Sequence, residues 1–199
     1  MIAVIDVTGN NLTSLTNAIK QLGYPYILTH DSTQIKEASH VILPGVGAAA
    51  TAMAALKHHQ LIDTLLKLSQ PLLGICLGMQ LLMDYSEEEN ISCLKRIPGC
   101  VKRLTPNENH PVPHMGWNQL IWKKNSPLAQ GLSAKDYVYF VHSYALLDAE
   151  NAVARCQYNQ EFTAIVQYQN VYGMQFHPEK SATVGLTLLN NFLQLESLC

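Results

Sequence analysis

The sequence carries few charged side chains. Asp, Glu, Lys and Arg make up 14% of the 199 residues, against about 25% in an average soluble domain. The formal net charge is −2 and no run of Lys or Arg occurs, so the chain lacks the basic surface that binds nucleic acid or an anionic membrane. So little surface charge favours a protein that is partly covered by another chain.

Long apolar runs are also missing. The N-terminal stretch MIAVIDVTGN has neither the basic region nor the apolar length of a signal peptide or a membrane span. Gly, Pro, Gln or Lys soon interrupts the apolar runs elsewhere. We therefore expect no leader and no membrane helix.

The cysteines do not form a recognisable framework. There are five, an odd number, and no CxxC spacing occurs, so neither a disulfide scaffold nor a zinc cage is indicated. We expect a reduced, cytoplasmic protein that needs no metal and no other cofactor.

The first half alternates strand and helix patterns. Asn10 or Asn11 is placed to cap the first helix, and Gly23 to end it. The alternation predicts a parallel sheet with helices on both faces. We expect strands at residues 2–7, 24–29, 40–44 and 71–75, and helices at residues 10–23, 48–57, 60–68 and 77–86.

The second half contains closely spaced strand patterns, which predict antiparallel hairpins with a turn at residues 158–160. A final helix is expected at residues 182–197. We find no internal repeat, linker or low-complexity segment. The expected fold class is α/β: one domain over residues 1–199, with an open, mixed, mainly parallel sheet flanked by helices.

The segment GICLGMQ places Cys76 between two glycines, after a buried strand and before a helix. G-x-C-x-G in this setting is the nucleophile-elbow pattern with sulfur in place of oxygen. Gly74 and Gly78 remove side chains that would collide in the sharp turn, and the helix N-terminus favours a thiolate. The alternative is a buried structural cysteine beside two packing glycines.

A thiolate needs a base, and the base needs a group that orients it. QFHPEKS supplies both, because Pro178 restricts His177 to extended geometry and residues two apart then point the same way. His177 and Glu179 are therefore expected side by side. The segment LPGVG (43–47) follows another buried strand and is placed to complete an oxyanion site. Viewed alone, each of these segments could equally be an ordinary turn.

Together, LPGVG, GICLGMQ and QFHPEKS occur in the order and at the separations that resemble the class I, triad-type glutamine amidotransferases. PGVG in place of the PGG of most relatives, with PHMGWN (113–118) and YFVHSY (139–144), more narrowly resembles the glutaminase subunits of imidazole glycerol phosphate synthases. The resemblance covers nearly the whole chain.

The resemblance implies that Cys76 attacks the side-chain amide of glutamine. His177 would take the thiol proton and pass one to the departing ammonia, while Glu179 orients His177. Leu77 and the Gly45-Val46-Gly47 backbone would hold the oxyanion. Water would then hydrolyse the glutamyl thioester to glutamate.

The resemblance also implies a substrate pocket and a partner. Residues expected in contact with glutamine are Gln80, Glu88, Ser143 and Tyr144. The ammonia would pass through a protected channel to a (β/α)₈ cyclase, which makes imidazole glycerol phosphate and aminoimidazole-carboxamide ribotide in histidine biosynthesis. The two subunits would form a heterodimer, and positions expected at its interface are Asn11, Trp117, Tyr139 and Lys180.

One segment departs from the family pattern. Residues 6–11 read D-V-T-G-N-N where many relatives read D-Y-G-x-G-N, so Val7, Thr8 and Asn10 replace a Tyr and two Gly. The departure bears on the first turn at the expected interface rather than on the triad.

Other aromatic and histidine residues have ordinary interpretations. His58 and His59 point about 100° apart on a helix and are expected at a solvated helix end. His110 and His114 are expected in a loop, since no further Cys or His completes a zinc set. For Trp117 and Trp122, core packing is the default.

Two other functions stay open at this stage. One is a stand-alone cysteine hydrolase, such as a peptidase or γ-glutamyl hydrolase, built on the same elbow. The other is a non-catalytic scaffold that only binds a partner, against which the intact Cys-His-Glu set argues.

Overall fold

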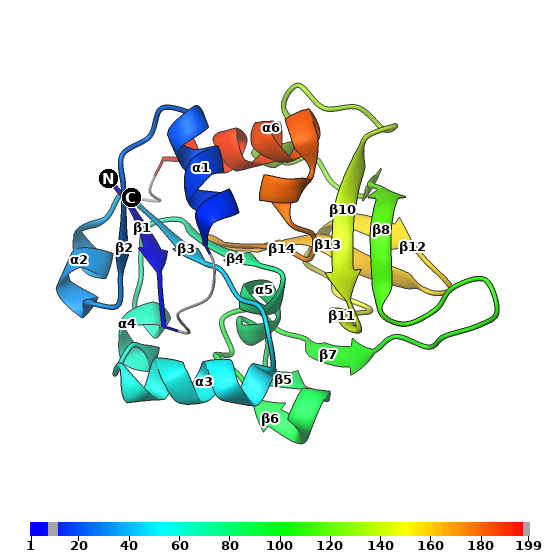
Figure 1. Cartoon of the computed structure of the whole chain (residues 1–199), viewed down its shortest axis with the longest axis horizontal. Helices are drawn as coiled ribbons and strands as arrows, with labels where there is room; N and C mark the ends of the chain where they lie inside the picture. Colours follow the sequence, from blue (N-terminus) through cyan, green and yellow to red (C-terminus); the bar gives the residue numbers. More distant parts are fainter. Residues whose placement is uncertain (8–11, 197–199) are drawn as a thin grey trace.

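The computed structural model describes residues 1–7 and 12–196 of the chain (Figure 1). Its main feature is an eight-stranded sheet in the order β2-β1-β3-β4-β14-β13-β12-β9. Strands β2, β1, β3, β4 and β14 run parallel, and the others continue antiparallel. Their bounds are β1 Ile2–Ile5, β2 Tyr26–Thr29, β3 His40–Leu43, β4 Leu72–Ile75, β9 Ile121–Trp122, β12 Ala152–Gln157, β13 Glu161–Tyr168 and β14 Val171–Met174.

Helices cover both faces of this sheet (Figure 1). On one face, α1 (Thr13–Gln21) and α6 (Ala182–Leu193) bury Leu15 and Phe192 against Val4. On the other, α2 (Ser32–Glu37), α3 (Ala49–His58), α4 (Ile62–Leu66) and α5 (Leu77–Leu81) pack against alternate residues of the same strands. The predicted α/β class with a mixed sheet is therefore confirmed.

Two details of the first half differ from the prediction. Helix α2 was not expected; it begins because the Asp31 side chain accepts hydrogen bonds from the backbone N–H groups of Thr33 and Gln34. The helix expected over 77–86 ends at Leu81, since residues 85–86 form the short strand β5. Gly23 follows the end of α1 with φ 83°, as expected, whereas Asn10 and Asn11 lie outside the described residues.

Two smaller sheets stand beside the main one. Strands β8 (His114–Gln119) and β10 (Tyr137–His142) pair antiparallel. Strands β11 (Tyr144–Leu146), β7 (Cys100–Arg103), β5 (Tyr85–Ser86) and β6 (Ile91–Ser92) form a four-stranded sheet. Short 3₁₀ turns occur at η1 (Glu88–Asn90), η2 (Pro127–Ala129) and η3 (Pro178–Lys180). The expected turn at 158–160 joins β12 to β13.

The parallel strands end on one edge of the sheet. LPGVG follows β3, Cys76 follows β4, and His177 comes three residues after β14. Because β3, β4 and β14 are neighbours in the sheet, these three segments meet, as ligand sites do at the carboxyl ends of α/β sheets. Among the helices of the described residues, none has the length and apolar character to cross a membrane.

We predict that Gly78→Ala prevents stable folding. A Cβ at this position would lie 1.8 Å from the backbone oxygen of Leu43, and backbone cannot move aside without separating β3 from α5. Thermal unfolding of the purified variant, or its failure to accumulate as soluble protein, measures the loss.

Gly23→Ala is the matched control for this test. It also replaces a glycine, but no atom lies within 4 Å of the added Cβ and only the positive φ is strained. It should cost about 1–2 kcal/mol. Equal melting temperatures for the two variants would contradict the packing argument.

Candidate active site

Cys76 occupies the turn between β4 and α5. Its backbone has φ 53° and ψ −112°, a conformation that costs a non-glycine residue about 1–3 kcal/mol. The surrounding structure leaves no alternative: a Cβ on Gly74 would lie 2.6 Å from the Gly78 oxygen, and the backbone N–H of Cys76 donates to Met174 O at 2.8 Å. The sharp, strained turn expected from G-x-C-x-G is thus present.

His177 and Glu179 lie side by side, as predicted. His177 Nδ1 lies 2.9 Å from Glu179 Oε1, and both side chains are largely buried. The geometry differs from the expected one: His177 is extended, but Glu179 belongs to the 3₁₀ turn η3. The turn is fixed through Ser181, whose hydroxyl donates to His177 O at 2.7 Å and accepts from Tyr139 N at 2.9 Å.

The charge state of His177 follows from its two neighbours. Burial alone lowers the pKa of this imidazole, but the adjacent Cys76 sulfur and the Glu179 carboxylate outweigh it and raise the pKa to about 10. His177 Nε2 is buried and has no hydrogen-bond partner among residues 1–7 and 12–196. This nitrogen is therefore available to interact with the Cys76 sulfur or with a bound molecule.

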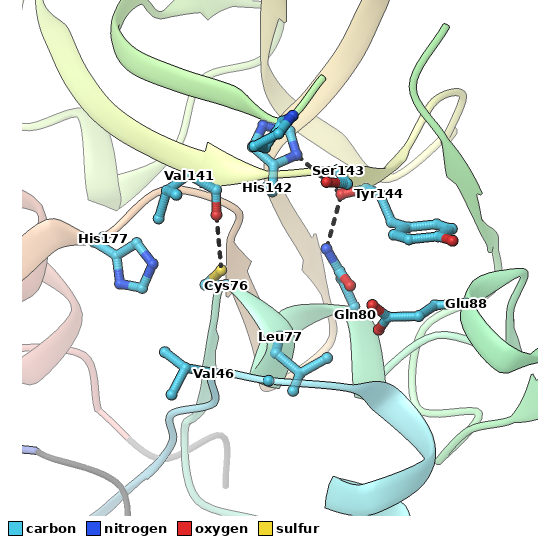
Figure 2. A pocket seen from close by; sticks show the side chains of 12 residues that line it. Val46, Cys76, Leu77, Gln80, Glu88, Val141, His142, Ser143, Tyr144 and His177 are labelled. Atoms are coloured by element: carbon cyan, nitrogen blue, oxygen red, sulfur yellow. Dashed lines mark hydrogen bonds between the residues drawn. The ribbon is translucent and has the colours of Figure 1, made fainter. Parts of the chain in front are cut away.

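Cys76 and His177 line one cavity of about 330 Å³. Figure 2 shows the sulfur at its centre, with His177 on one side and Gln80 and Glu88 on the other. The lining residues include the candidates Val46, Gly47, Cys76, Leu77, Gln80, Glu88, Ser143, Tyr144 and His177. The structure therefore brings together residues from five separate parts of the sequence.

The PGVG segment lies against the elbow. A Cβ on Gly45 would lie 3.0 Å from Gly78 N and 3.1 Å from Leu77 Cβ, and Gly47 has φ 100°. Its backbone therefore passes directly beside the start of α5, as an oxyanion role requires. Val46 is half exposed at the cavity mouth.

Glu88 has a structural contact as well as a place in the cavity. Its Oε2 accepts the backbone N–H of Ala49 at 3.0 Å, and Glu89 accepts that of Ala50 at the same distance. Burial raises the pKa of Glu88. Glu88 and Glu89 therefore hold the start of α3.

The positions expected at a partner face gather around η3 and the β8–β10 pair. Trp117 and Tyr139 are register partners with ring centroids 6.0 Å apart. Trp117 is 53% exposed, so its default assignment to the core is wrong. Lys180 is exposed and lines a second cavity of about 310 Å³, which shares Val46 and His177 with the first. Asn11 lies outside the described residues.

The burial of two histidines, His142 in the cavity wall and His114 next to it, was not anticipated. His114 was expected in a loop, but it lies on β8, where its ring stacks on Tyr158 and its Nδ1 lies 3.1 Å from His142 Nε2. Burial lowers the pKa of His142 to about 3 and that of His114 to about 4. Among the described residues no cluster of His, Cys, Asp or Glu could hold a metal ion.

We predict that folding stability falls in mild acid because of these two rings. Both stay neutral in the folded protein, whereas unfolded histidines have pKa values near 6.5. Unfolding therefore takes up protons below about pH 6.5. The two neutral rings contribute fully to the free energy of unfolding above that pH, and this contribution is lost as the pH falls toward their folded-state pKa values of about 4 and about 3. Each proton contributes at most about 1.4 kcal/mol per pH unit.

Urea unfolding at several pH values between 7 and 4 measures this slope. His142→Gln removes one of the two titrating rings and should make the slope shallower by up to one proton. His58→Gln, at an exposed position on α3, should leave the slope as it is. An unchanged slope in His142→Gln would show that other groups cause the acid sensitivity.

Comparison with known proteins agrees with this site. The family model "Glutamine amidotransferase class-I" matches residues 3–195. The chain is 66% identical over 199 residues to "Imidazole glycerol phosphate synthase subunit HisH 2" of Legionella pneumophila (strain Paris), with all of both chains covered. It is 48% identical over 196 residues to subunit HisH of Xylella fastidiosa (strain 9a5c), covering 98% of each.

Solved structures share the fold at low identity. A crystal structure titled as a glutamine amidotransferase has a TM-score of 0.76 at 19% identity and covers 97% of each chain. A glutamine amidotransferase from Thermotoga maritima has a TM-score of 0.68 at 19% identity, with 97% of this chain and 96% of the other covered. By family model, relatives and fold, the chain belongs to the class I glutamine amidotransferases, and within them to the HisH subunits of imidazole glycerol phosphate synthase.

Proposed function

We propose that this chain hydrolyses glutamine to glutamate and ammonia and delivers the ammonia to a (β/α)₈ cyclase partner in histidine biosynthesis. The observation that carries the proposal is that Cys76 and His177 line one cavity while the Glu179 carboxylate lies 2.9 Å from His177 Nδ1, in a chain 66% identical to a named synthase subunit. The four described cysteines are all free, which fits a reducing, cytoplasmic setting. One domain spanning residues 1–199 carries the activity.

The reaction begins with a proton transfer. His177 Nε2 takes the Cys76 thiol proton, and its raised pKa keeps that proton on the imidazole while the thiolate attacks the amide carbon. A tetrahedral oxyanion forms. The backbone N–H of Leu77 and the Gly45-Val46-Gly47 segment would stabilise it; Val46, Gly47 and Leu77 line the cavity, and Gly45 packs against Leu77.

Breakdown of this intermediate releases ammonia. The C–N bond breaks as His177 returns the proton to the leaving nitrogen, which leaves a glutamyl thioester on Cys76. A water molecule then attacks the thioester, with His177 as base, and glutamate leaves as the thiol is restored. Glu179 accepts from Nδ1–H throughout and holds the imidazole toward the sulfur.

Substrate recognition uses the opposite end of the cavity. Glu88 lines that end and carries a carboxylate that can pair with the α-ammonium group of glutamine. Gln80, Ser143 and Tyr144 line the same region and supply amide, hydroxyl and backbone groups for the remaining polar atoms.

The second cavity offers a route for ammonia. It begins at Val46 and His177, where the first cavity ends, and extends to Glu179 and Lys180. A closed route matters because ammonia in neutral water becomes mostly ammonium, which has no lone pair for attack. Trp117, Tyr139 and Lys180 would then contact the partner at its outlet.

We predict that Cys76→Ala abolishes glutamine-dependent synthesis by the reconstituted pair but leaves ammonia-dependent synthesis intact. The substitution removes the nucleophile and leaves the partner's site unchanged. Product formation with glutamine and with ammonium salt as alternative nitrogen sources measures both activities. Surviving glutamine-dependent turnover would overturn the assignment of the nucleophile.

We also predict that the isolated chain hydrolyses glutamine slowly, and that the cyclase with its nucleotide raises the rate by orders of magnitude. Trp117→Ala should weaken this stimulation and the binding of the partner. Tyr168→Ala, an exposed aromatic position at the opposite edge of the sheet, is the control and should change neither. Full activity of the isolated chain would favour the stand-alone cysteine hydrolase.

A further inference from the structure

Gln175 is a polar side chain with no solvent exposure, and it lies directly behind the nucleophile. It follows β14 and precedes His177 by two residues, and its backbone N–H donates to Ala164 O at 2.9 Å. The carboxamide Nε2 lies 3.9 Å from Cys76 Sγ, and Oε1 lies 3.1 Å from Gln80 Nε2. One side chain therefore contacts both the reacting sulfur and a wall of the glutamine cavity.

The orientation of the Gln175 amide is fixed by its surroundings. Tyr144 O can only accept, so the Gln80 amide must turn its NH₂ toward it, at 2.8 Å (Figure 2). The same NH₂ reaches Gln175, which must therefore present its oxygen there. Its own NH₂ is left facing the sulfur.

The Tyr144 end of this chain is held in turn by the two buried histidines. His142 Nδ1–H donates to Tyr144 O at 2.9 Å, which leaves His142 Nε2 to accept from His114 Nδ1–H. His114 Nε2 then accepts from Asn118, whose NH₂ is fixed by a 2.9 Å bond to Gln157 O. The depressed pKa values of both rings keep this direction of donation at neutral pH.

The sulfur also lies near a hydrogen-bond acceptor, the backbone carbonyl of Val141. Cys76 Sγ lies 3.9 Å from Val141 O, to which a thiol can donate (Figure 2). Once His177 has taken the proton, this carbonyl dipole opposes the negative sulfur. The N–H of Gln175, by contrast, turns the positive end of its dipole toward the negative sulfur.

We propose that Gln175 stabilises the Cys76 thiolate through an N–H···S hydrogen bond and, through its oxygen, positions Gln80 at the glutamine cavity. The proposal deepens the proposed function and rests on it for the role of Cys76 and Gln80. The contact is long in the resting protein and shortens as the sulfur gains charge, as catalytic hydrogen bonds do between resting and activated states. A hydrogen bond to a charged group contributes more than one between neutral groups.

The test is alkylation of Cys76 by iodoacetamide without glutamine, in which the thiolate displaces iodide. The rate is followed across pH by mass analysis of the peptide that contains Cys76. Gln175→Leu removes both the N–H that faces the sulfur and the oxygen that accepts from Gln80. Its pH profile should move to higher pH, and its rate at pH 7 should fall on the order of tenfold or more.

Two further variants separate the proposal from a purely structural role. Gln175→Glu has nearly the native shape, and its oxygen replaces the donor that faces the sulfur, so its rate at pH 7 should also fall. Gln70→Leu removes another buried amide, one that donates to Ile35 O far from the site, and should lower stability without moving the profile.

The glutaminase assay then separates the two effects of Gln175. Loss of the N–H lowers kcat, while a displaced Gln80 raises KM, so Gln175→Leu should change both. A native alkylation profile in folded Gln175→Leu or Gln175→Glu would overturn the proposal. The alkylation assay uses no glutamine, so the two proposals can fail separately. If Gln175→Leu shifts the profile but the native protein does not hydrolyse glutamine, only the proposed function is wrong.

Discussion

The site depends on one close approach of backbone to backbone. The Leu43 carbonyl at the end of β3 lies where a Cβ of residue 78 would stand, at 1.8 Å. Only glycine permits this contact, and it brings the end of β3 against the first turn of α5. The positive φ of Cys76 follows from the same constraint, since the chain must reverse within one residue between β4 and α5. Packing of the surrounding sheet holds Cys76 in this strained conformation, and the sharp turn places its sulfur at the sheet edge.

The same contact organises the PGVG segment. Gly45 lies two residues after Leu43 and packs against Leu77, so anchoring Leu43 also anchors the start of this segment beside Leu77. The far end of that loop is held by Glu88 and Glu89, which accept the first N–H groups of α3. Glu88 also lines the cavity. The wall at which glutamine would bind is thus connected by hydrogen bonds to the loop at which the oxyanion would form.

The histidines on the two sides of the Cys76 sulfur have pKa values shifted in opposite directions. On the His177 side, the Cys76 sulfur and the Glu179 carboxylate outweigh desolvation, and the pKa of the imidazole rises. On the His142 side no carboxylate is adjacent among the described residues, so desolvation prevails and the ring stays neutral. A neutral His142 can hold a directed hydrogen-bond chain because it has one donor and one acceptor. In our proposals, His177 acts as a proton acceptor, whereas neutral His142 fixes the orientation of the neighbouring amides.

The sequence by itself determined the α/β class, the elbow at Cys76, the pairing of His177 with Glu179 and the family, because each rests on local spacing and backbone chemistry. Local patterns misplaced His114, Trp117 and the end of α5, since burial depends on which distant strands pair. Gln175 and His142 gave no sequence signal, because the role of a buried amide or imidazole depends on which groups face it across the fold. Only the tertiary structure decided those neighbours: the contacts join residues about 65 to 100 positions apart, beyond the reach of any local pattern.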